Sequence, residues 1–423
     1  MYDEIIMSLL SIIFLVLILL KLIIKIYLAN RQIKLIKNNI NHIPNNFINI
    51  LNLDQHHNHS EYNIKKLNLS ITQYLATTLL TLVMVFGSGI NWCNIFVNKI
   101  LLISNPYIHD TVIIVVYMIF SNLLSLIFSY YSIFEIEDKY GFNKMSVKIF
   151  FLDLIKSTLV SSIIFLPLLY LSFIIIYHFI YSWWILVFIL LVTLNLLMLI
   201  IYPIVIAPLF NKFKPLEDLS LKLELENLID KAGLFFKAIF VMDASKRSTH
   251  GNAYFTGFGR SKRIVFFDSL LNKLSNQEIV AVLAHELGHF KYKHIIKQMI
   301  LSLGLMLLVL YLVSLLFYNS TLYHSLGVIE INAANGIIIT MIILELLSFY
   351  ISPFFKMLSR HHEFEADYFA STITNKQHLI SGLIKLSSEN AAVLYPDPWY
   401  VAVHYSHPSL GERIQNLINS DHK

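Results

Sequence analysis

The chain has 423 residues, of which 56% are hydrophobic and only 14% are charged. Soluble domains carry about 45–50% apolar and about 25% charged residues, so this composition excludes an ordinary soluble protein and indicates a membrane protein. The formal net charge of +5 fits basic residues gathered on one membrane face. These residues are not clustered in an aromatic-rich domain, so we expect no nucleic-acid partner. The single cysteine, Cys93, excludes an intramolecular disulfide and a cysteine-based metal site.

Seven apolar segments are each long enough to cross a bilayer, which takes about 20 residues. They lie near residues 5–28, 72–94, 111–134, 157–181, 184–209, 298–318 and 336–357. The first segment has acidic residues before it, lysines at its far end and no small-residue cleavage site. We therefore expect a membrane anchor there rather than a signal peptide.

The distribution of lysine and arginine predicts the orientation of the spans. If the N-terminus lies outside, the outer segments contain Lys99 alone, and almost every other basic residue falls in the inner segments 29–71, 135–156, 210–297 and 358–423. Cytoplasmic segments carry the excess of basic residues in membrane proteins. The two long polar segments, 210–297 and 358–423, are therefore predicted to share the cytosolic side.

Two polar features lie outside the main motifs: a histidine-rich stretch and a glutamate within a span. The stretch 31–71 carries the histidines His56, His57 and His59 without a periodic pattern, so we expect a solvated loop rather than a metal site. Glu345 lies inside the seventh span, where an isolated carboxylate is costly. It either lines an internal aqueous cavity or forms a hydrogen bond between helices, and both alternatives stay open.

Segment 210–297 is predicted to begin with mixed helix and strand. Residues 216–232 have helical apolar spacing that ends at a glycine, and 238–242 and 263–267 have the composition of strands. The stretch 248–259 between them is expected to form an edge strand and a turn. Ser275 and Glu278 then fit a capping box at the start of a further helix.

That further helix carries the motif His285-Glu286-Leu287-Gly288-His289. Residues four apart lie on the same helix face. His285 and His289 can therefore bind one metal ion, while Glu286 is placed to act on a water molecule. The alternative is a pair of ordinary helical histidines, since short motifs also arise by chance. A strand layer before such a helix would suit a peptide that adds to a strand edge.

A zinc site of this type needs a third protein ligand, with the fourth position left for water. Glu363 and Asp367 follow the seventh span and share one helix face, so we expect one carboxylate to bind the metal and the other to orient a ligand histidine. His361 and His362 are weaker alternatives. Closer to the C-terminus, His407 and Arg413 could donate hydrogen bonds to a developing oxyanion, although a structural role is equally open for both.

Taken together, these motifs resemble the type I CAAX prenyl protease family, which consists of multi-spanning membrane zinc metalloproteases. The matching residues are Asp243-x-Ser245-Lys246-Arg247-Ser248, Asn252-Ala253-Tyr254, the His285–His289 motif, Glu363-x-x-Ala366-Asp367, His404-Tyr405-Ser406-His407-Pro408 and Glu412-Arg413. The loop at residues 138–144 also resembles the amino-terminal half of the family.

The resemblance implies a mainly α-helical membrane protein with seven transmembrane helices in a barrel around an internal chamber. A small α+β, zincin-like metalloprotease unit would lie on the cytosolic side. It also implies residue roles. One Zn²⁺ per chain would be bound by His285, His289 and Glu363, and Glu286 would be the catalytic base. Asp367 and His407 would also be catalytic residues. Asn252 and Arg413 would bind the substrate.

On this basis residues 1–209 form a membrane domain with five spans, and residues 210–423 form the metalloprotease domain with the last two. The implied reaction is removal of the three C-terminal residues of prenylated CAAX proteins; the alternative is quality-control proteolysis of unprenylated membrane proteins. The short outer loop between the last spans and the absence of a retention signal indicate a bacterial-type member of the inner membrane; a eukaryotic member would occupy the endoplasmic reticulum. Peptide or prenylated-protein substrates and the lipid bilayer are the expected partners, and the oligomeric state is left open.

Two further classes of membrane protein fit the sequence less well. An intramembrane protease of the site-2 type would bury its motif within a span, whereas Lys291, Lys293 and His294 follow this motif directly. A transporter would account for seven spans and Glu345, but not for a metal triad divided between two polar segments.

Overall fold

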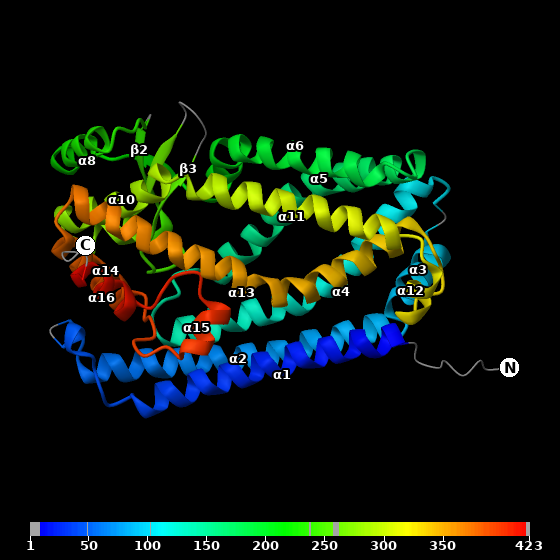
Figure 1. Cartoon of the computed structure of the whole chain (residues 1–423), viewed down its shortest axis with the longest axis horizontal. Coiled ribbons are helices and arrows are strands. Elements are labelled where there is room, and N and C mark those ends of the chain that lie inside the picture. The colour runs from blue at the N-terminus through cyan, green and yellow to red at the C-terminus, as the bar shows by residue number, and fades with distance from the viewer. Residues whose placement is uncertain (1–8, 49, 102, 237, 257–261, 420–423) are drawn as a thin grey trace.

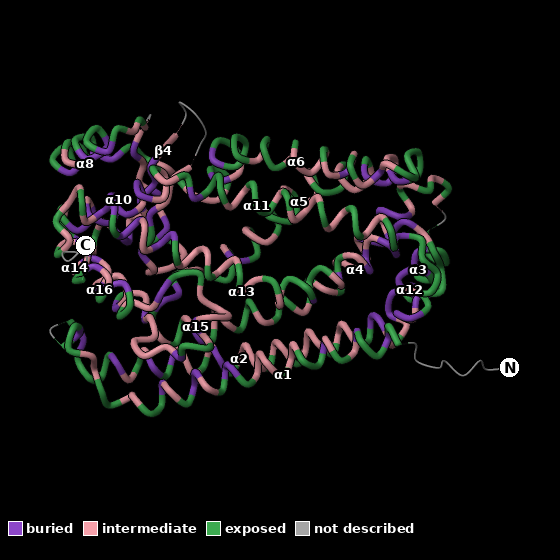
Figure 2. Tube along the Cα trace, viewed as in Figure 1, coloured by how far each residue is buried: buried purple, intermediate pink, exposed green. Residues whose placement is uncertain are grey.

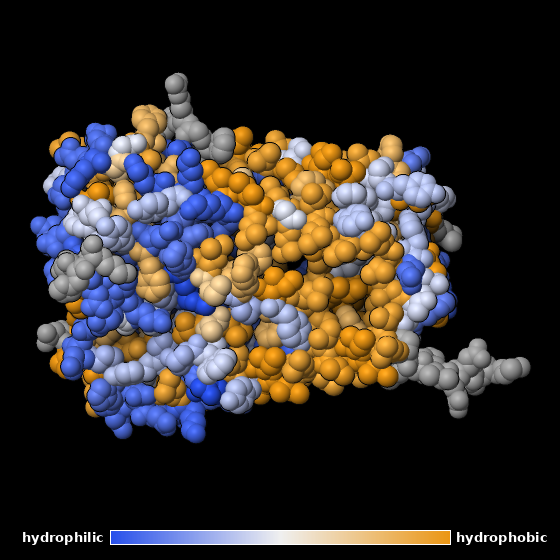
Figure 3. Space-filling view, in the orientation of Figure 1, coloured by the Kyte–Doolittle hydropathy of each residue, from blue (hydrophilic) through white to orange (hydrophobic). Residues whose placement is uncertain are grey.

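The computed structural model describes residues 9–48, 50–101, 103–236, 238–256 and 262–419. Within them, seven helices are long and apolar enough to cross a membrane, as predicted: α1 (Leu9–Asn38), α2 (Leu53–Phe86), α4 with η2 (Pro106–Glu137), α5 (Val147–His178), α6 with η3 and α7 (Trp183–Phe210), α11 (His294–Leu316) and α13 (Ala333–Ile373). These helices run along the long axis of the molecule (Figure 1). The surface over their middle is largely hydrophobic, whereas the end that carries the sheet is largely hydrophilic (Figure 3).

The third and fifth spans are built from several consecutive helical elements. α4 (Pro106–Tyr131) continues into the π-helix η2 (Ser132–Glu137), and α6 (Trp183–Ile201) continues through the π-helix η3 (Tyr202–Ile206) into α7 (Ala207–Phe210). Two short helices, α3 (Gly89–Ile100) and α12 (Ser320–Ser325), lie together at the end of the bundle opposite the sheet (Figure 1).

The stretch 31–71 is largely helical, so the predicted loop is wrong. α1 continues to Asn38, only a short segment with the 3₁₀ turn η1 (Asn45–Phe47) intervenes, and α2 begins at Leu53. The side chain of Asn52 accepts a hydrogen bond from the backbone of Gln55, and the Gln55 side chain accepts one from Asn52, which completes a capping box. The three histidines lie on the first turns of α2, where a polar helix gives no apolar stripe for sequence reasoning to detect. Among the described residues, they belong to no cluster with metal-binding spacing.

A four-stranded sheet with strand order β1-β2-β4-β3 precedes the motif helix. β2 (Ala238–Met242) and β4 (Arg263–Phe267) are parallel and have the bounds that the sequence predicted. β3 (Ala253–Thr256) pairs with β4 in antiparallel fashion and is an edge strand, as expected; the turn predicted at 257–259 lies outside the described residues. The other edge, β1 (Phe213–Pro215), was not predicted because three residues give too short a pattern.

The remaining helices lie at the hydrophilic end of the bundle (Figures 1 and 3). They are α8 (Leu219–Lys231), α9 (Asp268–Leu271), α10 (Asn276–Lys291), α14 (Lys376–Glu389), α15 (Pro398–His404) and α16 (Leu410–Asn419), with the 3₁₀ turn η4 (Ala244–Lys246). Gly233 follows α8 with a φ of 67°, the left-handed conformation expected of a glycine at a helix end.

The molecule has two large hydrophobic cores, one at each end of the bundle (Figure 2). At the sheet end, Leu225 of α8, Phe266 of β4 and Leu283 of α10 are buried in a single cluster that extends to α13 and α14. At the opposite end, the cluster includes Ile113 of α4 and Ile338 of α13. Because the sheet-end core fixes α10 against the sheet and α13, it also fixes the position of the motif histidines.

The hydrogen bond between helices that was one of the two alternatives for Glu345 is confirmed. Nζ of Lys21 donates to Oε1 of Glu345 at 2.7 Å, which forms an ion pair between α1 and α13. Glu345 also lines a hollow of about 340 Å³, together with Lys25 and Lys356. The Glu345 side chain is 62% exposed, and an internal aqueous cavity at this position stays a prediction.

Candidate metal centre

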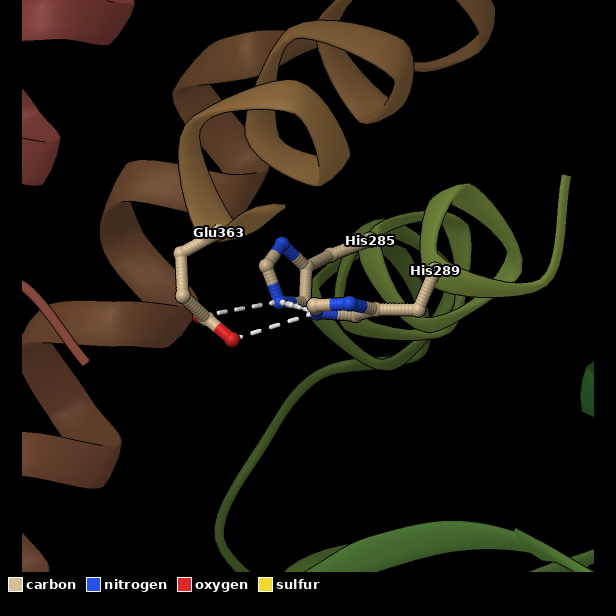
Figure 4. Close-up of side chains that lie close together, drawn as sticks. All are labelled: His285, His289 and Glu363. Carbon is tan, nitrogen blue, oxygen red and sulfur yellow. Dashed lines mark hydrogen bonds and ion pairs between the residues drawn. The ribbon is translucent and has the colours of Figure 1, made fainter. Parts of the chain in front are cut away.

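The candidate site is centred on α10, which begins at the predicted capping box. The Ser275 side chain accepts a hydrogen bond from the backbone of Glu278, and the Glu278 side chain accepts one from the backbone of Ser275. Ten residues along the chain from Ser275, the imidazole of His285 points from α10 towards α13, and that of His289 lies beside it (Figure 4). The Nε2 atoms of these two histidines are 3.2 Å apart.

Glu363 of α13 faces this pair of imidazoles. Its Oε1 lies 3.2 Å from Nε2 of His289, and its Oε2 lies 3.5 Å from Nε2 of His285. His285 and Glu363 are buried, and His289 is half-buried. Two nitrogens and one carboxylate oxygen thus converge from two helices, with the spacing of a metal site. The Oε2 atom of Glu363 is buried without a hydrogen-bond donor among the described residues. A cation at this position would satisfy that oxygen, so the residues fit a bound metal ion.

The approach of the two helices depends on a glycine within the motif. A β-carbon added to Gly288 would lie 2.8 Å from the Cα atom of Ala366, a residue of the second motif. Only a residue without a side chain allows α10 and α13 to approach this closely. The distance between the two ligand-bearing helices therefore depends on a small residue in each motif, Gly288 and Ala366.

A buried acidic residue supports the first histidine from behind. Nδ1 of His285 lies 2.8 Å from Oδ1 of Asp367, and the buried Arg413 of α16 donates hydrogen bonds to the same carboxylate through Nε at 2.9 Å and Nη2 at 2.6 Å. Burial and the Arg413 charge oppose protonation of His285, but the adjacent carboxylates of Asp367 and Glu363 outweigh them and raise its pKa to about 9. A bound cation would replace this proton, because metal binding requires a deprotonated ring nitrogen.

The other predicted site residues surround the same space. A cavity of about 670 Å³ is lined by Asn252, His285, Glu286, His289, Glu363, His407 and Arg413, with Asp367 behind His285. Glu286 is half-buried, one residue round α10 from the first histidine. The His407 side chain is 64% exposed, and its Nε2 lies 3.4 Å from Oε1 of Glu363. All eight residues named from the sequence are therefore brought together.

The weaker alternatives for the third ligand lie outside this cluster. His361 is 69% exposed and lies 3.6 Å from Glu365 rather than facing the motif histidines. His362 is buried, and its ring is stacked on that of His294, with the ring centres 4.0 Å apart.

Sequence reasoning missed two groups of residues around the site. One wall of the cavity comes from α2, where Tyr62 and Lys66 lie one turn apart; the incorrect loop prediction for this segment concealed their shared helix face. His294 and Glu365 form a second group behind His289. His294 is the next histidine after the motif in the sequence. It is five residues from His289, a spacing that does not place two residues on the same helix face.

Two protein-family models match consecutive parts of the chain. The CAAX prenyl protease N-terminal model, described as five membrane helices, matches residues 32–212, and the model of peptidase family M48 matches residues 215–420. A CAAX prenyl protease 1 homolog of Oryza sativa subsp. japonica is 34% identical over 407 residues, which is 94% of each chain. The chain belongs to this family of M48 peptidases.

Two further proteins are similar to this chain over most of their length. CAAX prenyl protease 1 of Saccharomyces cerevisiae is 39% identical over 313 residues, covering 70% of this chain and 69% of the relative. The crystal structure of S. mikatae Ste24p has 31% sequence identity and a TM-score of 0.89, covering 97% of this chain and 99% of that one. The predicted fold, a seven-span helical membrane protein with a small α+β metalloprotease unit, is confirmed. The prediction of a bacterial-type member and the division after residue 209 are untested and stay predictions.

Proposed function

We propose that this M48 peptidase is a zinc-dependent membrane endopeptidase that removes the three C-terminal residues of prenylated CAAX proteins. The observation that carries the proposal is the convergence of His285, His289 and Glu363 on a large cavity at the end of a seven-span bundle. Relatives of similar length that are named CAAX prenyl protease 1 support the substrate class.

Zinc is the metal we assign to this site. Two imidazole nitrogens and one carboxylate oxygen form a donor set that suits Zn²⁺ in catalytic sites, which keep a further position for water. When bound, zinc would supply a Lewis acid that polarises a carbonyl and makes a nearby water acidic near pH 7. The ligand residues are His285 and His289 of α10 and Glu363 of α13, and Asp367 orients His285.

Glu286 is the general base in this proposal. Its half-buried carboxylate lines the cavity next to the ligands. It takes a proton from water as the water oxygen forms a bond to the scissile carbonyl carbon, and it passes that proton to the leaving nitrogen as the C–N bond breaks. One water is consumed, and the products are a new carboxylate on the substrate and a tripeptide with a free amino group.

His407 is better placed than Arg413 to donate a hydrogen bond to the developing oxyanion. The His407 side chain is largely exposed in the cavity, whereas Arg413 uses both Nε and Nη2 to hold Asp367. Donors that face the position where charge develops stabilise the transition state. We therefore assign His407 to the oxyanion and assign Arg413 to holding Asp367, and through it His285, in place.

The substrate backbone would add to the edge of the sheet. β3 is the last strand of the sheet, and among the described residues its outer edge is not paired with another strand. Asn252 is exposed, directly precedes β3 and lines the cavity. A peptide that pairs with this edge would pass from β3 towards Glu286. The Asn252 side-chain N–H group could then donate to a peptide carbonyl, while its Oδ1 accepts a hydrogen bond from the backbone of Ala253.

We further propose that the site faces the cytosol, following the distribution of lysine and arginine described above. The hydrophilic end of the molecule in Figure 3 includes both α10 and the C-terminal helices, so the two polar segments that carry the site lie at the same end of the bundle. A lipid-modified C-terminus held at this membrane would then be close to the cavity.

The test is incubation of the purified protein with a prenylated and an unprenylated CAAX peptide, each with and without a zinc chelator. Chelator-sensitive release of the C-terminal tripeptide from the prenylated peptide alone is the expected result. Equal cleavage of both peptides would support general quality-control proteolysis instead, and cleavage that persists after the metal is removed would disprove the zinc mechanism.

A further inference from the structure

His294, the first residue of α11, lies behind the metal-ligand histidine His289. Nδ1 of His289 is 3.0 Å from Nδ1 of His294, and Nε2 of His294 is 2.8 Å from Oε2 of Glu365 on α13. His294 is 2% exposed, so no bulk water competes for its ring nitrogens. Three side chains from three helices thus form a continuous chain of polar contacts that ends at the metal centre.

The positions of the protons along this chain follow from the ligand role of His289. A histidine that binds a metal through Nε2 must be neutral and carry its proton on Nδ1. Two ring nitrogens 3.0 Å apart form a hydrogen bond only if one of them donates, so Nδ1 of His289 donates to Nδ1 of His294. The proton of His294 must then lie on Nε2, where the Glu365 carboxylate accepts it. Each assignment is consistent with the next, and each ring nitrogen of the two histidines then has one role.

The backbone between the two histidines has an uncommon conformation at one residue. Lys293 lies between α10 and α11 with a φ of 58°, a left-handed conformation that is uncommon for residues other than glycine. This turn directly follows the motif helix and precedes α11, whose first residue, His294, lies beside His289. Such conformations are costly and persist where the surrounding structure requires them.

We propose that His294 and Glu365 are positioning residues that fix the ring orientation and tautomer of His289 for metal binding. The two ligand histidines are then supported differently: His285 contacts the Asp367 carboxylate directly, whereas His289 reaches its carboxylate through an intervening imidazole. This inference rests on the metal centre of the proposed function, but it does not depend on the substrate.

The same residues do not form a good second metal site, although His294, His362 and Glu365 have potential ligand atoms close together. The rings of His294 and His362 are stacked with an angle of 7° between their planes. Because the lone pairs of an imidazole lie in its ring plane, the lone pairs of parallel rings do not converge on one ion. In addition, both ring nitrogens of His294 are already used in the chain to Glu365.

The test measures metal affinity rather than activity. The full-length protein and its variants are equilibrated with zinc in chelator-buffered solutions, and bound zinc is measured by elemental analysis. His294→Leu removes the acceptor for His289, so its zinc affinity should fall about 10- to 100-fold, the usual effect of losing a partner of a ligand histidine. His294→Gln should retain most of the affinity, because its amide offers a carbonyl oxygen to His289 and an N–H to Glu365.

His362→Phe is the matched control. It removes a buried imidazole from the same stack but preserves an aromatic ring against His294, so zinc affinity should stay at the wild-type value. An equal loss of affinity in His362→Phe and His294→Leu would overturn the proposal, because packing would then account for both. Two zinc ions per wild-type chain, falling to one in His294→Leu, would overturn it in favour of a second metal site.

The outcome for this proposal can be separated from that for the proposed function. A protein that shows these affinity differences but cleaves neither peptide would support the role of His294 and disprove the peptidase assignment. A wild-type protein that binds no zinc would overturn the positioning role together with the metal centre. Cleavage that depends on zinc, with the same affinity in His294→Leu as in the wild type, would overturn the positioning role alone.

Discussion

Gly288 of α10 packs directly on Ala366 of α13, so that an added β-carbon would lie 2.8 Å from the Ala366 Cα atom. Each residue lies between functional positions of its own motif: Gly288 between the two ligand histidines, and Ala366 between Glu363 and Asp367. The contact therefore sets the distance across which the metal must be held. A change of a few tenths of an ångström in this helix–helix distance would displace the functional residues of both motifs relative to one another.

Gly288→Ala should reduce both stability and metal binding. Replacing glycine by alanine in a helix ordinarily stabilises by about 1 kcal/mol, but the contact with a backbone atom forces α10 and α13 apart, which costs about 1–3 kcal/mol. We expect a lower unfolding temperature and weaker zinc binding. Gly304→Ala on α11 is the control, because nothing lies within 4 Å of the added carbon; this variant should be unchanged or slightly more stable. Wild-type zinc affinity in Gly288→Ala would contradict the proposed role of the contact.

Glu286→Gln should separate metal binding from catalysis. Glu286 is not among the clustered ligand residues, so zinc content by elemental analysis should stay near one ion per chain. Peptide cleavage should fall by about 10²- to 10⁴-fold, the range attributed to a positioned general base. His285→Ala should instead lose zinc and activity together. A Glu286→Gln protein that cleaves at the wild-type rate would exclude Glu286 as the base.

Arg413→Gln should destabilise the protein strongly. Its guanidinium holds Asp367 by two hydrogen bonds, and both side chains are buried. Removing one partner of a buried ion pair costs about 3–5 kcal/mol, because the other charge is left without compensation. The double variant Arg413→Gln/Asp367→Asn should lose less than the sum of the two single changes. Thermal unfolding in detergent measures the three variants, and additive losses would argue against a coupled pair.

Acid should destabilise the fold partly through His404 at the end of α15. Burial, followed by the positive charges of Lys356 and Lys25, lowers the pKa of His404 from 6.5 to about 4. Because the folded-state pKa lies below the unfolded value, the unfolded chain binds more protons between these limits, and stability falls as the pH is lowered from about 6.5 towards 4. His404→Phe keeps the ring stacked on Tyr400 and should reduce this slope. An unchanged slope in that variant would assign the acid sensitivity to other groups, such as the half-buried His250, whose pKa is also lowered by burial.

The parts of the structure that were predicted correctly have local signals in the sequence. The strand 238–242 is an apolar run, the strand 263–267 is apolar after Arg263, and the helix that begins after Ser275 has its two capping residues three positions apart. The motif histidines share a helix face by spacing alone. Glu363 could be named as the third ligand because the family motif places it there, although two membrane crossings separate it from α10 along the chain.

The parts that were missed depend on tertiary contacts. The polar first turns of α2 carry no periodic apolar stripe; the packing of α2 on α1 lies further along the helix, where Leu67 is clustered with Ala29 and Ile33. The role of His294 depends on the left-handed turn at Lys293 and on Glu365, which is 71 residues away in the sequence. Neither interaction has a spacing rule that a single sequence would reveal.

α13 is one uninterrupted helix of 41 residues that contains the seventh span and, further along, Glu363 and Asp367. At 1.5 Å per residue it is about 60 Å long, roughly twice the thickness of the hydrocarbon core. The remaining metal ligands are on α10, which is joined to α13 through α11, another span. A water-soluble peptidase therefore cannot be obtained from this chain by trimming away its membrane part. Any fragment that retains all three ligands in their native connection also retains two complete bilayer crossings.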